Sequence, residues 1–97
     1  MATPESKVKT EVKRTLVELG FYYFMPPANG FGRAGIPDIV GCRLTDGRFF
    51  VIECKAGKGK TTALQDRELV RIQQAGGIAL VINEDNVNQL KELLNEQ

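Results

Sequence analysis

Apolar residues near the start of the chain recur with the spacing of an amphipathic helix. Thr3 is a favourable N-cap, Pro4 suits the first helical position, and Glu5 supplies an acid in the first turn. These signals predict a helix that runs to Leu19 and stops at Gly20. Taking about 100° per residue, Glu5 lies inside the apolar stripe of this helix, which is formed by Val8, Val12, Leu16 and Leu19.

The rest of the chain alternates short apolar runs with helical patterns, which predicts an α/β fold. A Gly- and Pro-rich segment, residues 26–35, indicates a loop. The expected strands are residues 21–25, 39–42, 49–52 and 78–82. The middle two runs are apolar on both faces, as in strands that helices cover on both sides. We therefore predict a single domain, residues 1–97, built on a mixed β-sheet flanked by α-helices.

Two further helices are expected in the second half of the chain. Thr61 or Thr62 caps the first, which continues to about Gln74 before the break at residues 75–77. Its predicted buried residues are Leu64, Leu69, Val70 and Ile72. The last helix is expected from residue 85 to about residue 95.

The dipeptide Asp46-Gly47 stands between two apolar runs and predicts a hairpin with a type I′ turn. A two-residue loop at this point pairs Asp38 with Lys55 along the antiparallel ladder. Opposed residues share a face, and so do alternate residues of one strand. Asp38, Glu53 and Lys55 should therefore converge on one side of the hairpin, within about 5–8 Å of each other.

Two carboxylates and an ammonium group on one sheet face suit a metal-dependent phosphodiester centre. In an apolar sheet these groups would be desolvated, and the two carboxylates would repel each other. A divalent cation removes the repulsion, and hard oxygen ligands suit Mg²⁺ or Mn²⁺. Lys55 beside the metal can orient or deprotonate a water, or stabilise charge on the phosphate. The alternative is an Asp38–Lys55 ion pair with Glu53 at a strand end and no catalysis; convergence of all three favours the metal centre.

At these residues the chain resembles the VRR-NUC family of the PD-(D/E)xK nuclease superfamily. Pro37-Asp38 and Glu53-Cys54-Lys55 match the two halves of the superfamily motif. Such short patterns recur by chance, and the match becomes specific through the order of the surrounding elements. These are a helical Glu, a Gly-rich stretch into G-I-P-D, an I-E-x-K strand and a Gln on the next helix, here Glu5, residues 30–38, residues 52–55 and Gln65. The resemblance extends from Glu5 to about Val81.

The resemblance implies a restriction-endonuclease-like fold and a metal-dependent deoxyribonuclease, an endonuclease that hydrolyses phosphodiester bonds of DNA. Asp38 and Glu53 would ligate Mg²⁺ or Mn²⁺, with the backbone carbonyl of Cys54 as a third protein ligand. Lys55 would position or activate the attacking water.

Four further polar residues have both a plain structural explanation and a supporting role at the site. Glu5 suits the helix dipole, but its inward position and the resemblance make it an acid that reaches the metal cluster. Glu11, about 95° from the centre of the apolar stripe, is the fallback and fits a surface ion pair better. Gln65 alone is a solvated helix residue, whereas the resemblance has it orient water or touch the scissile phosphate. Lys9 stands where many family members carry Gln, and it can contact a phosphate.

Composition and charge leave both an enzyme and a binding module open. The chain has 97 residues, 42% apolar and 26% charged, with a net charge of +1. Residues 1–60 carry ten basic against six acidic residues, and residues 61–97 carry three against six. A polyanion would be drawn to the first part, although a solvated face is the simpler explanation. The DNA-contact candidates are Lys7, Lys9, Asn29, Arg33, Lys58 and Lys60.

The two cysteines, Cys42 and Cys54, do not form a common zinc motif, and the chain contains no histidine. By the pairing above they lie on opposite faces of the hairpin, as small core residues of a reduced protein. We expect a cytoplasmic protein of a bacterium or of a phage-infected host cell. No signal peptide or membrane span is recognisable, so no membrane partner is expected.

Rival functions are weaker. Gly59-Lys60-Thr61 resembles the end of a P-loop, but that pattern needs Gly at position 54, where Cys54 stands. A non-catalytic nucleic-acid-binding domain on the same fold is the other rival, and the presence of Asp38, Glu53 and Lys55 disfavours it. The stand-alone type in the resembled family implies a homodimer that acts on branched DNA such as the Holliday junction. The sequence leaves flap and plain duplex DNA open as substrates.

Overall fold

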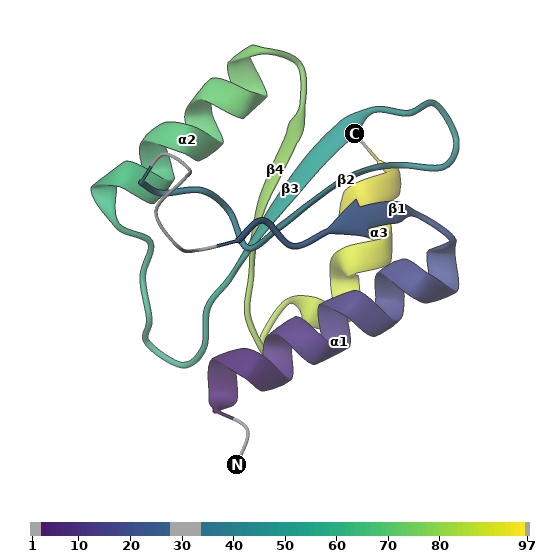
Figure 1. Ribbon diagram of the computed structural model, residues 1–97. Helices are drawn as coiled ribbons and strands as arrows, with labels where there is room; N and C mark the ends of the chain where they lie inside the picture. Colours follow the sequence, from purple (N-terminus) through teal and green to yellow (C-terminus); the bar gives the residue numbers. More distant parts are fainter. Residues whose placement is uncertain (1–2, 28–33, 97) are drawn as a thin grey trace.

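Four strands form one mixed sheet, and helices pack on both of its faces (Figure 1). This computed structural model describes residues 3–27 and 34–96. The elements are α1 (Pro4–Leu19), β1 (Tyr22–Phe24), β2 (Ile39–Cys42), β3 (Phe49–Cys54), α2 (Ala63–Gln74), β4 (Ile78–Ile82), the 3₁₀ turn η1 (Val87–Gln89) and α3 (Leu90–Asn95). The strand order is β1-β2-β3-β4; β1, β2 and β3 pair antiparallel, and β4 runs parallel to β3. The predicted α/β class and helix-flanked mixed sheet are confirmed.

Helix α1 has the predicted start and end. The side chain of Thr3 accepts a hydrogen bond from the backbone N–H of Ser6 at 3.1 Å, and Pro4 opens the helix. Gly20 adopts φ +73°, and its N–H donates to the last carbonyls of the helix. The buried stripe consists of Val8, Val12 and Leu16. The inward face of α1 was therefore readable from the sequence.

The two sheet faces are covered unequally. One face carries the larger core, which α1 and α3 close and which includes Leu16, Ile39, Phe50, Ile52 and Leu90. Helix α2 covers part of the other face, with a small cluster of Val40, Val51 and Leu69. Within residues 3–27 and 34–96, no helix is long and apolar enough to cross a membrane.

The hairpin of β2 and β3 is paired two residues away from the predicted register. Ile39 pairs with Ile52, so extending the ladder by one residue puts Asp38 opposite Glu53. The prediction that Asp38 lies opposite Lys55 is wrong. Because the shift is two residues, the alternation of faces is unchanged. Asp38, Glu53 and Lys55 still belong to one sheet face, and Ile39 and Ile52 belong to the core on the other.

A longer loop, residues 44–47, replaces the predicted two-residue turn. The backbone N–H of Arg43 donates to the Arg48 carbonyl at 3.0 Å, which closes the ladder before the loop. The Asp46 carboxylate accepts two hydrogen bonds from the Arg43 guanidinium, at 2.8 and 2.7 Å, and one from the Arg48 N–H at 3.0 Å. Gly47 takes the left-handed conformation, φ +73°, at the end of the loop. The side chain of Arg43 therefore fixes Asp46 in a wider turn.

Helix α2 buries a different stripe from the predicted one. Leu64 and Val70 are 50% and 47% exposed, so the prediction that they are buried is wrong, whereas Leu69 is buried and Ile72 packs beside it. The helix contacts the sheet mainly through β4. Its inward stripe includes the buried carboxyl residue Glu68. A hydrophobic pattern could not reveal an inward position that carries a charge.

The last predicted helix is split into η1 and α3. The side-chain oxygen of Asn83 accepts hydrogen bonds from the backbone N–H groups of Asp85 at 2.8 Å and Asn86 at 3.2 Å. Such bonds hold a turn where a helix would otherwise begin. The α-helix therefore starts only at Leu90, and Leu90 and Leu94 are fully buried.

Gly35 brings the segment that leads to Asp38 against the first turn of α2. Its φ is +83°, and a Cβ at this position would lie 2.5 Å from the Leu64 carbonyl oxygen and 2.9 Å from the Gln65 nitrogen. Glycine is required both by the backbone conformation and by the close approach of another backbone. Contact with α2 thus fixes where the chain enters β2.

Replacing Gly35 by alanine should lower the free energy of unfolding by roughly 2–4 kcal/mol, because a left-handed backbone and a steric clash combine. Gly47→Ala is the matched control, since Gly47 has φ +73° but a Cβ added there would meet nothing within 4 Å. We expect about 1 kcal/mol for the control. Urea denaturation measures both, and equal losses would contradict the packing role of Gly35.

Candidate active site

Asp38 and Glu53 lie side by side where β2 begins and β3 ends. The Asp38 carboxylate is tied to β3, because the backbone N–H of Cys54 donates to its Oδ2 at 2.8 Å. Its side chain is 20% exposed, and its Oδ1 faces the ammonium group of Lys9. The hairpin register and this hydrogen bond together hold the two carboxyl groups on one sheet face.

Glu53 is a buried acid with an unsatisfied oxygen. It is only 3% exposed, and its Oε2 has no hydrogen-bond partner among the described residues. Burial, together with hydrogen bonding to Asp38 and the charge of Asp38, raises the pKa of Glu53 to about 8, although the Lys55 charge acts in the opposite direction. At this buried position Glu53 must therefore either be paired with a cation or be protonated.

Lys9 joins the cluster from α1. Its Nζ lies 3.5 Å from Asp38 Oδ1 and 3.7 Å from Glu5 Oε2. Burial acts to lower the pKa of Lys9, but the charges of Asp38 and Glu5 outweigh it and raise the pKa above 10.5. Sequence reasoning gave Lys9 only a phosphate contact and missed these ion pairs. The i,i+4 spacing from Glu5 was the signal that could have revealed the first of them.

The acid near the cluster from α1 is Glu5, the preferred residue. Its link through Lys9 places its charge close enough to act on Glu53. Glu11, the fallback, forms an ion pair with Arg14, and its side chain is 49% exposed. Glu11 therefore has the surface ion pair that its position on the helix favoured.

Lys55 and Cys54 follow Glu53 at the end of β3. The backbone N–H of Lys55 donates to the Ile82 carbonyl at 2.9 Å, which anchors this lysine beside β4. The Cys54 thiol is buried in the α1-side core, and burial raises its pKa to about 12. The backbone N–H of Cys54 donates to Asp38 at 2.8 Å, and its backbone carbonyl is the third metal ligand that the resemblance implies. The thiol is a core group and no nucleophile.

Gln65 serves the start of α2. Its side-chain Oε1 accepts a hydrogen bond from the Thr62 N–H at 2.9 Å, while the Thr62 hydroxyl accepts one from the Gln65 N–H at 3.2 Å. This reciprocal capping box fixes the orientation of the Gln65 side chain. A phosphate contact through its amide NH₂ group would leave the capping bond intact.

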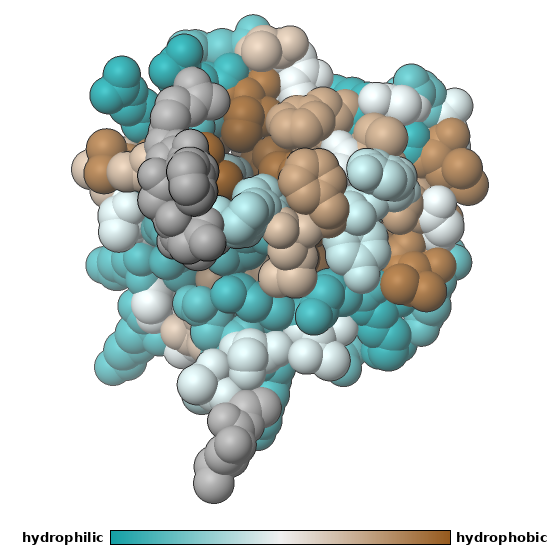
Figure 2. All heavy atoms as spheres, in the orientation of Figure 1, coloured by the Kyte–Doolittle hydropathy of each residue, from teal (hydrophilic) through white to brown (hydrophobic). Residues whose placement is uncertain are grey.

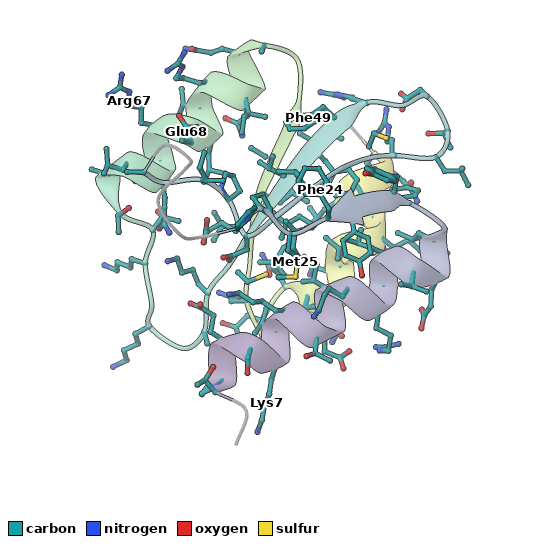
Figure 3. The ribbon with its side chains drawn as sticks, in the orientation of Figure 1. Lys7, Phe24, Met25, Phe49, Arg67 and Glu68 are labelled. Atoms are coloured by element: carbon teal, nitrogen blue, oxygen red, sulfur yellow. The ribbon has the colours of Figure 1, made fainter. Side chains whose placement is uncertain are left out.

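The structure separates the basic DNA-contact candidates. Lys58 and Lys60 are exposed in the segment between β3 and α2, which the Gly57 N–H anchors to Glu84 at 2.6 Å. Lys7 projects from α1 away from the sheet (Figure 3) and lines a hollow with Glu84. Of these surface lysines, Lys58 and Lys60 follow the cluster residue Lys55 closely in the sequence. The remaining candidates, Asn29 and Arg33, lie outside the described residues.

A cavity of about 240 Å³ opens beside Asp38. Lys9 and Asp38 supply its charged wall, and Met25 and Ile36 are apolar parts of its lining. Prolines complete the lining, namely Pro26, Pro27 and Pro37. Asp38 is therefore accessible to a ligand larger than water, whereas Glu53 itself is buried.

The donor set fits a hard divalent cation of the kind that keeps several waters. The described residues contain no group of three or more His, Cys, Asp or Glu side chains arranged as a metal cage. Mg²⁺ usually takes one or two protein carboxylates and completes its shell with water and phosphate. Asp38 and Glu53 supply two, and the unsatisfied oxygen of Glu53 is the kind of group that a cation satisfies.

Comparisons with solved structures identify the fold. One chain described as "VRR_NUC domain" matches with a TM-score of 0.77 at 25% sequence identity, over 94% of this chain and 97% of that chain. A second, "VRR_NUC domain protein", matches with a TM-score of 0.72 at 22% identity, over 99% of this chain and 91% of that one. The chain has the VRR-NUC fold. Comparisons with family models and with curated proteins each found no match.

These neighbours confirm the resemblance drawn from the G-I-P-D and I-E-x-K segments, and they support a nuclease-family domain. The VRR-NUC fold spans nearly the whole chain. The motif residues Asp38 and Glu53 meet in it because the hairpin pairs their strands.

The raised pKa of Glu53 predicts that the metal-free protein loses stability as the pH rises. The ordinary pKa of a glutamate is 4.5, and the pKa of Glu53 in the folded protein is about 8. Below pH 4.5 the carboxyl is protonated in both the folded and the unfolded state, and the protein is at its most stable in this respect. As the pH rises through 8 the buried carboxyl must ionise, and this part of the free energy of unfolding is lost. The loss should be on the order of 2–4 kcal/mol in the free energy of unfolding. Denaturation at a series of pH values in EDTA measures it.

Glu53→Gln should flatten this profile, and Glu11→Gln, which removes an exposed carboxylate, should leave it unchanged. A wild-type protein as stable at pH 9 as at pH 5 would show that Glu53 titrates normally.

Proposed function

We propose that this protein is a Mg²⁺- or Mn²⁺-dependent DNA endonuclease. The observation that carries the proposal is the buried, unsatisfied Glu53 oxygen beside Asp38, with Lys55 and Lys9 next to the pair. The VRR-NUC fold of the chain supports the same reaction class. Without a metal, two adjacent carboxylates would have to share a proton or would repel each other. The presence of such a pair in an apolar sheet therefore suits a metal-binding function.

Each residue of the cluster has a distinct task in this reaction. Asp38 and Glu53 would hold the cation, and the Cys54 N–H keeps Asp38 in place. The bound metal would supply Lewis acidity and lower the pKa of a coordinated water. Lys55 would orient the attacking water and offset negative charge as it develops on the phosphate.

Glu5 and Gln65 would support the cluster from two helices. Glu5 adds a negative charge near the cation and fixes Lys9 through the 3.7 Å ion pair. Gln65, held by its capping box, would offer its amide group to water or to the scissile phosphate. The Cys54 backbone carbonyl would be a third protein ligand of the metal.

The proposed substrate is branched DNA, such as a four-way junction, and the proposed site of action is the cytoplasm. The two free cysteines suit a reducing compartment. The cavity beside Asp38 would admit the strand to be cut, and Lys58 and Lys60 would position phosphates along it. Flap or plain duplex cleavage is the alternative, and a non-catalytic DNA-binding role is the second alternative.

A homodimer would give two symmetric cutting sites, and one sheet face offers a surface for it. Tyr22 and Phe24 of β1 and Phe49 of β3 are 66%, 50% and 47% exposed. By the strand pairing they lie on the α2 side of the sheet, and within the described residues no helix makes extensive contact with β1. Figure 3 labels Phe24 and Phe49, and in the same view Figure 2 shows apolar residues gathered over the strands. A second copy of the chain would cover this exposed apolar patch in the proposed homodimer.

Substitutions in the cluster should remove cleavage without unfolding the protein. Asp38→Asn keeps an acceptor for the Cys54 N–H, and Lys55→Ala removes a half-buried amine, so both variants should fold. We expect each to lose at least about 100-fold in the rate of junction cleavage with Mg²⁺, while DNA binding persists. Lys91→Ala, on α3, is the control. A folded Lys55→Ala protein that cuts at nearly the wild-type rate would overturn the mechanism.

Charge placed on the aromatic surface should separate the protomers. Phe24→Glu should shift the protein from dimer to monomer in sedimentation velocity, because an ionised carboxylate would be buried in the interface. Val17→Glu is the control, since Val17 is 66% exposed on α1 and lies outside this surface. A wild-type protein that stays monomeric would refute the homodimer and leave the nuclease proposal standing.

A further inference from the structure

The ammonium group of Lys9 lies close to the carboxylate of Asp38, which would be a metal ligand in the proposed site. Asp38 Oδ2 accepts a hydrogen bond from the Cys54 N–H at 2.8 Å, and Oδ1 is the oxygen that faces Lys9. Lys9 Nζ lies 3.5 Å from this Oδ1 and also 3.7 Å from Glu5. The lysine side chain is 28% exposed, so water screens these contacts only in part.

The position of Lys9 affects the net charge of the carboxylate cluster. When all are ionised, Glu5, Asp38 and Glu53 supply three negative charges, against which Lys9 and Lys55 supply two positive ones. A divalent cation would then leave this cluster with one positive charge. Without Lys9 the same cluster would attract the cation more strongly, but it would be neutral once loaded. A phosphodiester is an anion and favours the positively charged state.

We propose that Lys9 is a positioning residue, a resident counter-ion that weakens metal binding to the free protein and strengthens the hold of the loaded site on DNA phosphate. This inference rests on the proposed nuclease function and deepens it. In the free protein Lys9 keeps Glu5 and Asp38 together. When metal and DNA bind, its charge is available to the phosphate from within the cavity that Lys9 helps to line.

Substitution of Lys9 by a neutral residue should therefore change two affinities in opposite directions. Calorimetric titration of MnCl₂ into DNA-free protein should show binding to Lys9→Met about tenfold tighter than to wild type. Binding of a DNA oligonucleotide in CaCl₂, measured by fluorescence anisotropy, should be weaker for the same variant. The metal-free melting temperature should fall, because Glu5 and Asp38 lose their partner. Lys9→Arg should restore wild-type behaviour in all three measurements.

Two further variants sharpen the test. Lys91→Met removes a positive charge from exposed α3 and should change neither affinity beyond the small effect of net charge. Lys9→Gln is a second neutral variant, which keeps the proposal testable if Lys9→Met does not fold. A structural role alone would lower the melting temperature without tightening Mn²⁺ binding.

The outcomes separate this inference from the proposed function. Mn²⁺ binding to wild type, with equal or weaker binding to both neutral variants, refutes the role of Lys9 and leaves the nuclease proposal intact. No Mn²⁺ binding to wild type or to any Lys9 variant refutes both. Tighter Mn²⁺ binding together with weaker DNA binding in the neutral variants supports the inference.

Discussion

The pairing of β2 with β3 places two carboxylates next to each other in a sheet that is otherwise apolar, and the site depends on this contact. The Cys54 N–H fixes Asp38, and the larger core holds β3 through Phe50 and Ile52. Desolvation then acts mainly on Glu53, whose Oε2 has no hydrogen-bond partner in the described part of the chain. The packing that stabilises β3 is thus also the cause of the unfavourable electrostatics at its end.

Two lysines moderate that cost from different elements. Lys55 extends the strand that carries Glu53, whereas Lys9 approaches from α1 and joins Glu5 to Asp38. An ammonium group offsets charge but cannot bind both carboxylates in the geometry of a metal ion. Proton, lysine and divalent cation are therefore three ways to balance the same charges, and a phosphodiester adds the next negative charge to the balance.

The unequal cover of the sheet gives its two faces different tasks. The α1 and α3 face holds most of the buried apolar side chains and stabilises the strands. The α2 face is only partly covered. Its exposed aromatic residues extend from the loop end of the β2–β3 hairpin towards Asp38 and Glu53. Gly35 completes this face by letting the chain that enters β2 touch the first turn of α2. Accessible surface and carboxylates therefore share one side of the sheet.

The sequence by itself determined most of the elements and the face on which each motif residue lies. Helix caps at Thr3 and Gly20 are local, and strand alternation has a period of two, so Asp38 and Glu53 stayed on one face although the register was wrong by two residues. Tertiary structure decided the rest. Arg43 holds Asp46 in a longer loop, α2 turns Glu68 inward, and Lys9 reaches an acid far away in the chain. Arg43 itself is held by a hydrogen bond to the distant Leu94 carbonyl at 2.9 Å. Contacts between residues distant in sequence thus contribute to each of these features, and no local pattern encodes such contacts.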